Sequence, residues 1–531
     1  MLSRRYCSFK NLLTTVLFVG TLAQPYLAGA LDCTQPPNQG TPACIGQWTP
    51  PFKWGTTNPS EQGTVAVHLN VLPNGKVFGW SRGGAAGGGN NGIEPVVTWD
   101  PTTNQYIEGP PMDDLFCSGH AQLPDGRLLV SGGTLDGAAV ATPYDWRTGV
   151  WGTSVRMNNN RYYPSVLPLA NGEQLVIAGG TTNAAGQKVE NQIPQVWTLN
   201  DTFRDLTGAN FKLPQFPWVF LAPDNRVFIA GPMYNSYWLT TTGAGSIINT
   251  GLKHQTGNGW FRDRTAGSAV MYRPGKILIA GGAAVDKTTT PYQALVTNTA
   301  EIIDLNVTPP VWQKAGTMVA PSVDHMLILL PDGNVFKVGG TTAMVVTPEG
   351  WLGNDADETK AILTPQIWSP SLMSWRSVAS MQVPRKYHST GVLLPDGRVL
   401  VAGGGKIAGF VDHRDAQIYS PPYLFMGPRP TINGIVSQRG NDIVQYGESF
   451  TVVTSNTDVT RVTLTRLPSM SHSLDWNQRF DELSNVVKVA GGYQVTAPPN
   501  KNVCPPGYYY LHLLNNKGVP SVARIIQIPV S

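Results

Sequence analysis

Charged residues are scarce in this 531-residue chain, where Asp, Glu, Lys and Arg together make up 14%. The net charge at pH 7 is only +4, and no dense run of lysine and arginine occurs. Nucleic-acid binding depends on concentrated positive charge, so a nucleic-acid partner has little support. By contrast, the chain contains 57 Gly, 43 Pro, 15 Trp and 18 Tyr. This mixture predicts many short strands joined by tight turns rather than helices.

Beyond the N-terminus the sequence has no apolar run that could span a membrane as a helix. The N-terminal run from Leu12 to Leu22 is short, follows three basic residues and ends at Gln24-Pro25. Small residues at Ala28–Ala30 then offer a cleavage site. We therefore predict a secretory signal peptide at residues 1–30, an uncleaved anchor being the alternative. The mature chain is expected to be secreted or held at the cell surface, without a membrane span.

Cysteine is also rare, with only five residues in the chain. Cys7 leaves with the predicted signal peptide. Cys33 and Cys44 lie close together, and in an oxidising compartment we expect them to form a disulfide. Cys117 and Cys504 are far apart in sequence and are compatible with a disulfide or with two buried thiols. We interpret Cys504 as a buried thiol.

An internal repeat runs through most of the chain. Each copy has an apolar strand, a tight turn, a second apolar strand and often Gly-Gly, and successive turns are 46 to 64 residues apart. This period and these hairpin turns are typical of kelch-type propeller blades. Seven copies predict an all-β, seven-bladed propeller around an axial channel. The turns begin at Asn74, Asp125, Asn171, Asp224, Pro274, Asp332 and Asp396.

The repeat stops after Tyr419–Leu424. The remaining hundred or so residues alternate between apolar and polar side chains, as in Ser449–Val453 and Tyr508–Leu513, which is typical of an Ig-like β-sandwich. The expected organisation is an N-terminal segment at 31–44, the propeller at 45–422 and the sandwich at 423–531.

The repeat also aligns residues that are distant in sequence. Counting back eight residues from each turn reaches the start of the preceding strand, at Ala66, Cys117, Tyr163, Phe216, Ala266, Asp324 and His388. If the innermost strands line the axis, all seven lie near one end of the channel. Three of them, Cys117, Tyr163 and His388, can bind or modify a metal, and Tyr387 directly precedes His388.

A set that mixes imidazole and tyrosine has a specific chemical meaning. The tyrosine phenol has a pKa of about 10 and must lose its proton to bind a metal well. Imidazole and phenolate together suit Cu(II) or Fe(III). Tyrosine can also be oxidised by one electron, so a metal and a tyrosyl radical together form the two-electron oxidant that alcohol oxidation by O2 requires.

Four motifs carry a resemblance to a known family. They are Leu115–Gly119, with a Phe-Cys pair, Arg161–Ser165, with Arg-x-Tyr, Arg385–Ser389, with Tyr-His, and Ser471–Ser473, followed by Gln478-Arg479. Over nearly the whole mature chain the sequence resembles the galactose oxidase and glyoxal oxidase family of copper radical oxidases. Because the last motif lies in the predicted sandwich, both domains support this resemblance.

The resemblance implies a role for each residue. Tyr163, joined to Cys117 by a thioether, would be a metal ligand and hold the radical, so the pair forms a cofactor derived from the protein. His388 and His472 would be further ligands of one copper ion, and Tyr387 an axial ligand that accepts the substrate's hydroxyl proton. Substrate carbon would give a hydrogen atom to the Tyr163 radical, and reoxidation by O2 would yield hydrogen peroxide.

The family also has an aromatic shield over the radical tyrosine. We assign it to Trp260, and expect Arg262 or Arg264 to face the substrate. The chain lacks room before the first blade for the carbohydrate-binding domain of galactose oxidase, and Tyr163-Pro164 is closer to glyoxal oxidase. We therefore expect a substrate other than galactose, a small aldehyde or primary alcohol.

The other histidines lack motif support, and we interpret them as structural or surface residues. They are His68, His120, His254, His325, His413 and His512, with His325 the strongest rival ligand because it is one residue off the register. Asp324 either hydrogen-bonds a ligand or ties down a turn, and we favour the turn.

The expected function is thus a secreted, monomeric, peroxide-producing copper oxidase that uses a small molecule and O2. Two alternatives stay open. A kelch propeller can bind a glycan or protein without catalysis, or an extracellular matrix protein can retain an idle site.

Overall fold

The computed structural model of the protein describes residues 33, 38–82, 96–109, 114–134, 138–182, 188–255, 263–348 and 352–530. Its helices are short: α1 (Pro42–Ile45), η2 (Thr207–Ala209), η3 (Glu358–Lys360) and η4 (Pro422–Phe425). Within these residues no helix is long and apolar enough to cross a membrane. Antiparallel strands make up most of the regular structure, which confirms the all-β class. The predicted signal peptide lies outside the described residues.

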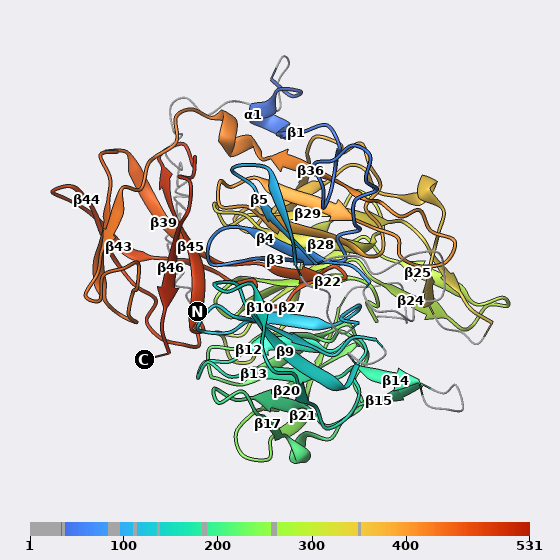
Figure 1. The fold of residues 1–531 in the computed structure, drawn as a ribbon. Helices are drawn as coiled ribbons and strands as arrows, with labels where there is room; N and C mark the ends of the chain where they lie inside the picture. The colour runs from blue at the N-terminus through green and yellow to red at the C-terminus, as the bar shows by residue number, and fades with distance from the viewer. Residues whose placement is uncertain are drawn as a thin grey trace, which may run out of the picture.

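Seven antiparallel sheets of the described chain form the blades of a propeller (Figure 1). Blade one contains β3 (His68–Val71), β4 (Val77–Trp80), β5 (Val96–Asp100) and β6 (Gln105–Gly109), extended by β40 (Ser469–Ser471) and β41 (Leu474–Asp475). Blade two contains β7 (Gly119–Gln122), β8 (Leu128–Ser131), β9 (Val140–Asp145), β10 (Val150–Trp151) and β11 (Val155–Arg156). Blade three contains β12 (Ser165–Pro168), β13 (Gln174–Ile177), β16 (Gln195–Trp197) and β17 (Phe203–Asp205).

The next four blades follow the same order from the axis outward. Blade four contains β18 (Trp218–Leu221), β19 (Val227–Gly231), β20 (Asn235–Thr240) and β21 (Ser246–Lys253). Blade five contains β22 (Ser268–Arg273), β23 (Lys276–Ala280), β26 (Thr299–Asp304) and β27 (Trp312–Thr317). Blade six contains β28 (Val323–Leu329), β29 (Val335–Thr341), β32 (Gln366–Ser369) and β33 (Ser374–Ser377). Blade seven contains β34 (Ser389–Leu393), β35 (Val399–Gly403) and β36 (Asp415–Ser420).

Three two-stranded hairpins extend from the blades, and two four-stranded sheets follow the propeller. The hairpins are β14 (Gly180–Thr182) with β15 (Lys188–Glu190), β24 (Ala283–Asp286) with β25 (Gln293–Val296), and β30 (Met344–Val346) with β31 (Leu352–Asn354). One C-terminal sheet contains β37 (Gly434–Val436), β38 (Ser449–Val453), β44 (Gly492–Thr496) and β43 (Ser484–Val489). The other contains β42 (Phe480–Glu482), β39 (Val459–Arg466), β45 (Gly507–Asn515) and β46 (Arg524–Ile528). These two sheets form the Ig-like sandwich.

The N-terminal strands close the propeller ring. β1 (Gln47–Trp48) and β2 (Phe52–Lys53) both pair with β36, so blade seven combines the two ends of the repeat region. Just before β1, a disulfide joins Cys33 to Cys44, as expected. Cys504 is a buried free thiol, which confirms its interpretation, and Cys117 is also buried and free.

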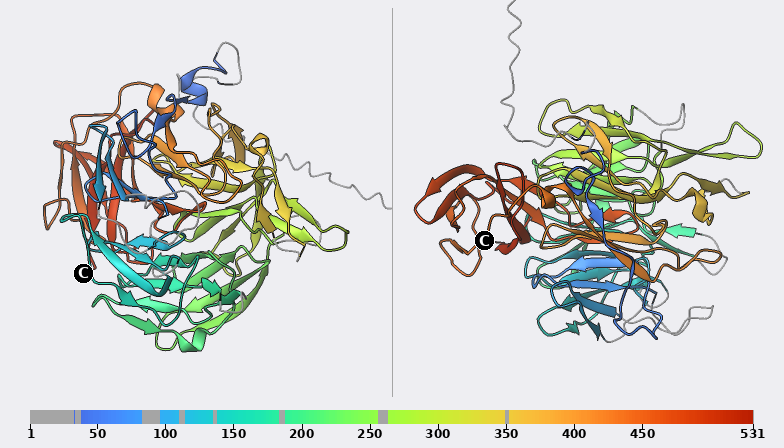
Figure 2. Two further views of the ribbon diagram at one scale, coloured as in Figure 1. Left: turned by 45° about the vertical axis from the view of Figure 1, so that its right-hand side comes forward. Right: turned by 90° about the horizontal axis from the view of Figure 1, so that it is seen from above.

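The sandwich packs against the end of the propeller that carries the repeat turns, beside the ring in Figure 2. Four sandwich residues donate hydrogen bonds to prolines that open these turns. The bonds are Gln527 Nε2 to Pro124 O at 2.9 Å, Asn502 Nδ2 to Pro223 O at 2.9 Å, Thr463 Oγ1 to Pro331 O at 2.8 Å, and Ala523 N to Pro395 O at 2.8 Å. The predicted turns therefore form the docking surface, and the residues eight positions earlier lie at the opposite end of the inner strands.

The inner strands are buried on both faces, because each blade packs against its two neighbours. All residues of β3, β7, β12, β28 and β34 are buried. One hydrophobic cluster crosses three blades, with Leu69 in β3, Met326 in β28 and Val392 in β34. Apolar burial of this extent is the main driving force for closing the ring.

A lysine side chain is buried within this apolar packing. Lys337, in β29, is 1% exposed, and its ammonium donates to Gly339 O at 3.2 Å. Burial lowers the pKa of Lys337 from 10.5 to about 7. Above pH 7 the unfolded chain therefore binds more protons at this site than the folded chain, so folding becomes more favourable as the pH rises toward 10.5.

We predict that Lys337→Met stabilises the protein by on the order of 2 kcal/mol at pH 6 to 7, since it removes the cost of burying the ammonium. The gain should fade toward pH 10.5, where the lysine is neutral in both states. Chemical denaturation at several pH values measures this, with exposed Lys314→Met in β27 as the control. A gain that does not depend on pH would contradict the burial argument.

Candidate metal centre

The residues at the start of the inner strands share an unusual backbone conformation. Six of the seven have a positive φ between 47° and 67°, namely Cys117, Tyr163, Phe216, Ala266, Asp324 and His388. Residues with a side chain rarely adopt this left-handed region. Amide-to-carbonyl bonds join these residues across neighbouring blades, from Tyr163 to Cys117 at 3.0 Å, from Phe216 to Tyr163 at 2.9 Å and from Asp324 to Ala266 at 2.7 Å. The blades thus present these side chains at one level around the axis.

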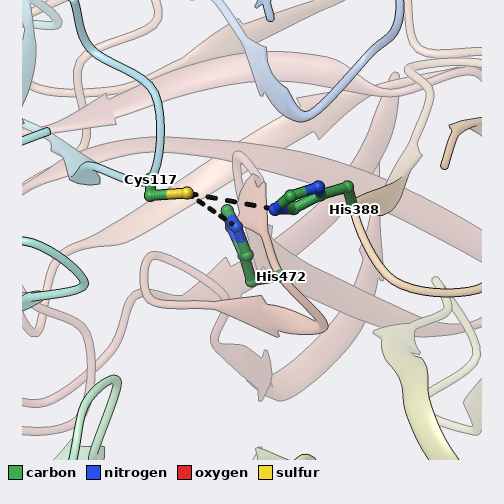
Figure 3. A group of neighbouring side chains, drawn as sticks. All are labelled: Cys117, His388 and His472. Atoms are coloured by element: carbon green, nitrogen blue, oxygen red, sulfur yellow. Dashed lines mark hydrogen bonds between the residues drawn. The ribbon is translucent and has the colours of Figure 1, made fainter. Parts of the chain in front are cut away.

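Three potential metal ligands converge at this level, shown in Figure 3. The sulfur of Cys117 lies 3.4 Å from Nε2 of His472 and 3.9 Å from Nε2 of His388. One ligand atom from each residue lies within 4.8 Å of the others. Beside them, the hydroxyls of Tyr163 and Tyr387 are hydrogen-bonded to each other. The structure therefore brings together all five residues singled out by the motifs.

Both histidines are oriented through their second ring nitrogen. His388 donates from Nδ1 to Gly405 O at 2.6 Å, which leaves the Nε2 lone pair toward the cluster. His472 Nδ1 lies 2.5 Å from Ser471 Oγ, and its Nε2 likewise points to the cluster. Such outer partners fix the tautomer and the ring orientation that a metal needs.

Burial keeps the cluster neutral at ordinary pH. It raises the pKa of Tyr163 and Tyr387 well above 10, and that of Cys117 to about 12. It lowers the pKa of His388 to about 4 and that of His472 well below 6.5. The imidazoles thus offer free lone pairs, whereas the phenols need a nearby positive charge to ionise.

The sandwich delivers His472 through a hairpin inserted into the propeller. β40 pairs with β3, opposing Ser469 to Asn70 and Ser471 to His68, and so runs from the turn end of blade one toward the register level. His472 follows β40 directly, with φ 48°. In blade five, Ser268 Oγ donates to Ser473 O at 2.7 Å and holds the tip of the hairpin.

Asp475 closes the loop around His472, a role that sequence reasoning missed. Its Oδ1 accepts from the amides of Ser469 at 2.9 Å, Asn477 at 3.0 Å and Gln478 at 3.0 Å. Burial raises the pKa of Asp475 to about 7. The Asp-x-Asn-Gln spacing that follows His472 is typical of such a turn and could have indicated it.

In two of the four motifs the arginine is buried and stabilises the backbone. Arg161 donates from Nη1 to Ala178 O at 2.7 Å, and Arg385 donates from Nη1 to Gly403 O at 2.8 Å. Both are fully buried, and each supports the chain just before Tyr163 or Tyr387. The arginines of these motifs therefore hold the backbone that carries the tyrosines.

Arg264 occupies the same place in blade five, so of the two arginines considered to face the substrate, Arg262 or Arg264, the structure excludes Arg264. Its guanidinium is fully buried, donating to Gly281 O at 2.7 Å and to Glu301 Oε1 at 2.7 Å. Because these bonds occupy its guanidinium, Arg264 stabilises blade five. Trp260 and Arg262 lie outside the described residues.

Two aromatic residues beside the cluster, Tyr162 and Phe216, were not assigned a role from the sequence. The rings of Tyr162 and Phe216 lie 4.0 Å and 4.7 Å from that of Tyr163, and the Cys117 thiol interacts with the phenols of both Tyr162 and Tyr163. Burial raises the pKa of Asp324 to about 7, and among the described residues its Oδ2 has no hydrogen-bond partner.

The rival ligand His325 lies outside this group. Its Nδ1 is 3.0 Å from Ser322 Oγ, and its ring is fully buried. It is not one of the three residues whose ligand atoms converge in the described chain.

Comparison with known families agrees with this arrangement. The model of the glyoxal oxidase N-terminus matches residues 93–417, and that of the galactose oxidase-like early set domain matches residues 429–528. The chain belongs to the galactose oxidase and glyoxal oxidase family. The expected resemblance and the propeller-plus-sandwich fold are thereby confirmed.

The alignments with individual relatives cover most of this chain. A galactose oxidase from Gibberella zeae is 30% identical over 511 residues, which span 90% of this chain and 70% of that protein. An aldehyde oxidase GLOX from Vitis pseudoreticulata is 28% identical over 478 residues, spanning 81% and 85%. The solved structure of a fungal alcohol oxidase of the AA5 family, in complex with copper, has a TM-score of 0.76 at 25% identity and covers 91% of this chain and 100% of that one.

We predict that Asp475→Ala destabilises the protein by about 1–3 kcal/mol, because it leaves amides of the His472 loop without an acceptor. Asp475→Asn keeps the accepting oxygen and should stay within about 0.5 kcal/mol of the wild type. Denaturant unfolding measures both, with exposed Asp458→Ala as the control. Equal effects of the alanine and asparagine variants would show that the amide bonds are unimportant.

Proposed function

We propose that this protein is a copper radical oxidase that oxidises a small aldehyde hydrate or primary alcohol with O2 and releases hydrogen peroxide. The observation that carries the proposal is the convergence of the Cys117 thiol with Nε2 of His388 and His472, beside the hydrogen-bonded phenols of Tyr163 and Tyr387. The structural relative in complex with copper supports the same metal.

The donor set fits copper. Two neutral imidazoles, each oriented through Nδ1, and two phenols suit Cu(II). Burial disfavours the phenolates of Tyr163 and Tyr387, and a divalent cation between them would compensate this cost. Tyr163, Tyr387, His388 and His472 are therefore the proposed ligands.

A bound copper ion would supply a one-electron redox partner and a Lewis acid. The side chains of the protein would carry out the proton transfer and the hydrogen-atom transfer. The Tyr387 phenolate accepts the hydroxyl proton of the substrate, and the Tyr163 phenoxyl accepts a hydrogen atom from the substrate carbon. The alcohol thereby loses two protons and two electrons: one electron leaves with the hydrogen atom, and the other would pass to a bound copper ion. O2 then accepts the two electrons and two protons and becomes hydrogen peroxide.

The thioether between Cys117 and Tyr163 requires an oxidation of its own. The S–H bond of Cys117 and one ring C–H bond of Tyr163 break, a C–S bond forms, and two protons and two electrons leave. O2 is the oxidant and becomes hydrogen peroxide. The Cys117 thiol is buried and interacts with the Tyr163 phenol, an arrangement suited to this reaction.

The proposed substrate class rests on the relatives and on the family model that the chain matches. Relatives include a galactose oxidase, an aldehyde oxidase and an alcohol oxidase. The match to the glyoxal oxidase model favours a small aldehyde or alcohol over galactose. The Cys33–Cys44 disulfide supports a secreted or cell-surface location.

Two assignments, the aromatic shield and the oligomeric state, stay predictions. Trp260 is the proposed shield over the radical, while the rings of Tyr162 and Phe216 pack against Tyr163 within the described chain. The protein is expected to act as a monomer.

We predict that aerobic loading with Cu(II) joins the Cys117 and Tyr163 peptides into a pair that resists reduction and weighs two hydrogens less. Mass spectrometry of the reduced digest measures this, and fragmentation identifies the linked tyrosine. Tyr163→Phe should abolish the link. Tyr162→Phe is the matched control and should retain it, since only Tyr163 lies at the register level with its hydroxyl on Tyr387. Two unmodified peptides from fully loaded wild type would rule out the radical mechanism.

We also predict that the copper-loaded protein releases peroxide with glyoxal, methylglyoxal, glycolaldehyde or simple primary alcohols. Tyr387→Phe should lower kcat by about 10²–10⁴, because it removes the group that accepts the substrate proton. Tyr446→Phe in the sandwich is the control and should leave kcat unchanged. A protein that binds copper and forms the link but oxidises none of these substrates would instead favour an idle site or a binding propeller.

A further inference from the structure

A chain of buried polar side chains leads away from Cys117. The Cys117 amide donates to His68 Nε2 at 3.2 Å, His68 Nδ1 lies 3.1 Å from His120 Nε2, and His120 Nδ1 lies 2.6 Å from Ser469 Oγ. Ser469 then donates to Asn70 Oδ1 at 2.5 Å. His68, His120, Ser469 and Asn70 are all 0% exposed. These residues form what we call the His68 chain.

The amide at one end determines the direction of every bond. An amide N–H can only donate, so Nε2 of His68 must be the unprotonated acceptor. Neutral His68 then carries its proton on Nδ1 and donates to His120 Nε2. His120 in turn carries its proton on Nδ1 and donates to Ser469. A single pair of tautomers thus satisfies the whole chain, and a charged imidazole at either position would lose one acceptor.

This geometry argues against a path for protons. The chain ends at a backbone amide, which does not release its proton at ordinary pH, so a proton entering at Ser469 has no exit toward the metal centre. The chain instead joins separate parts of the fold. His68 and Asn70 lie on β3 of blade one, His120 on β7 of blade two, and Ser469 on the hairpin that carries His472.

Contacts with neighbouring rings also restrain the His68 side chain. It stacks on Trp80, with ring centroids 4.7 Å apart and an angle of 10° between planes. On another side it lies 5.6 Å from the His472 ring. His68 therefore contacts Cys117 and lies beside His472, one of the proposed copper ligands, and it has little freedom to reorient.

We propose that His68 and His120 are positioning residues that hold Cys117 in its left-handed conformation and fix the hairpin beside it, so that the thiol meets the Tyr163 ring during thioether formation. Cys117 has φ 62°, and His68 accepts the hydrogen bond from its amide. This inference rests on the proposed function for the cross-linking step. The oxidant of that step is O2, with the electron balance given above.

The test measures the rate of cross-linking after aerobic Cu(II) loading, by mass spectrometry of the reduced Cys117 and Tyr163 peptides. His68→Leu removes the acceptor for the Cys117 amide and should slow cross-linking roughly tenfold or more, as expected for misaligned reacting groups. His68→Gln restores an acceptor oxygen and should recover part of the rate. His120→Leu, which removes the partner of His68, should fall between His68→Leu and the wild type.

His512→Leu is the matched control. His512 is another fully buried histidine, in β45 of the sandwich, and its ring nitrogens have no hydrogen-bond partner in the described chain. Its loss should leave the cross-linking rate unchanged. A folded His68→Leu that cross-links at the wild-type rate, or a His512→Leu that slows cross-linking equally, would overturn the positioning role.

A second measurement needs neither copper nor cross-linking. In copper-free protein, hydrogen exchange at the Cys117 amide should be faster in His68→Leu than in wild type and in His512→Leu, because the amide has lost its acceptor. Unchanged exchange would also overturn the role. Failure of wild-type protein to cross-link would count against the proposed function alone, since the exchange experiment still tests the His68 chain.

Discussion

The insertion of the β40–β41 hairpin along β3 is the constraint on which the site depends. Strand pairing between Ser469–Ser471 and His68–Asn70 makes a segment of the sandwich part of blade one. The sandwich docks on the repeat turns, so only a strand that runs the length of the inner strand can carry His472 to the opposite end of the channel. Asp475, Ser268 and the His68 chain then hold the tip of the hairpin. Without this pairing, His472 would not reach His388 and the two tyrosines.

The remaining site residues come from the propeller itself, at the point where each chain segment turns into an inner strand. A left-handed residue at that point in six blades costs conformational energy that the closed, buried ring offsets. The blades repeat one local backbone geometry, and the side chain at that position differs from blade to blade. Ala266 and Phe216 fill their positions with apolar groups, whereas Cys117, Tyr163 and His388 carry reactive ones.

Burial sets the electrostatics of this centre. The same desolvation keeps the imidazoles unprotonated and the phenols protonated. The imidazoles of the cluster therefore have free lone pairs, while the phenols would ionise only beside a cation. The His68 chain lies in the same environment, where burial lowers the pKa of His68 and His120 as well.

The sequence by itself determined the blade count, the shared register of Cys117, Tyr163 and His388, and the family, because hairpin turns and short motifs are local patterns that repeat at a fixed distance. It also predicted the Cys33–Cys44 disulfide. It could not choose between Arg262 and Arg264, because the distance along the chain from the site does not determine which way a guanidinium points. Only the tertiary structure decided the route of His472, the hydrogen bonds of Asp475, His68 and His120, and the contact of Tyr162 with Cys117. Those depend on contacts between residues hundreds of positions apart, which no local pattern records.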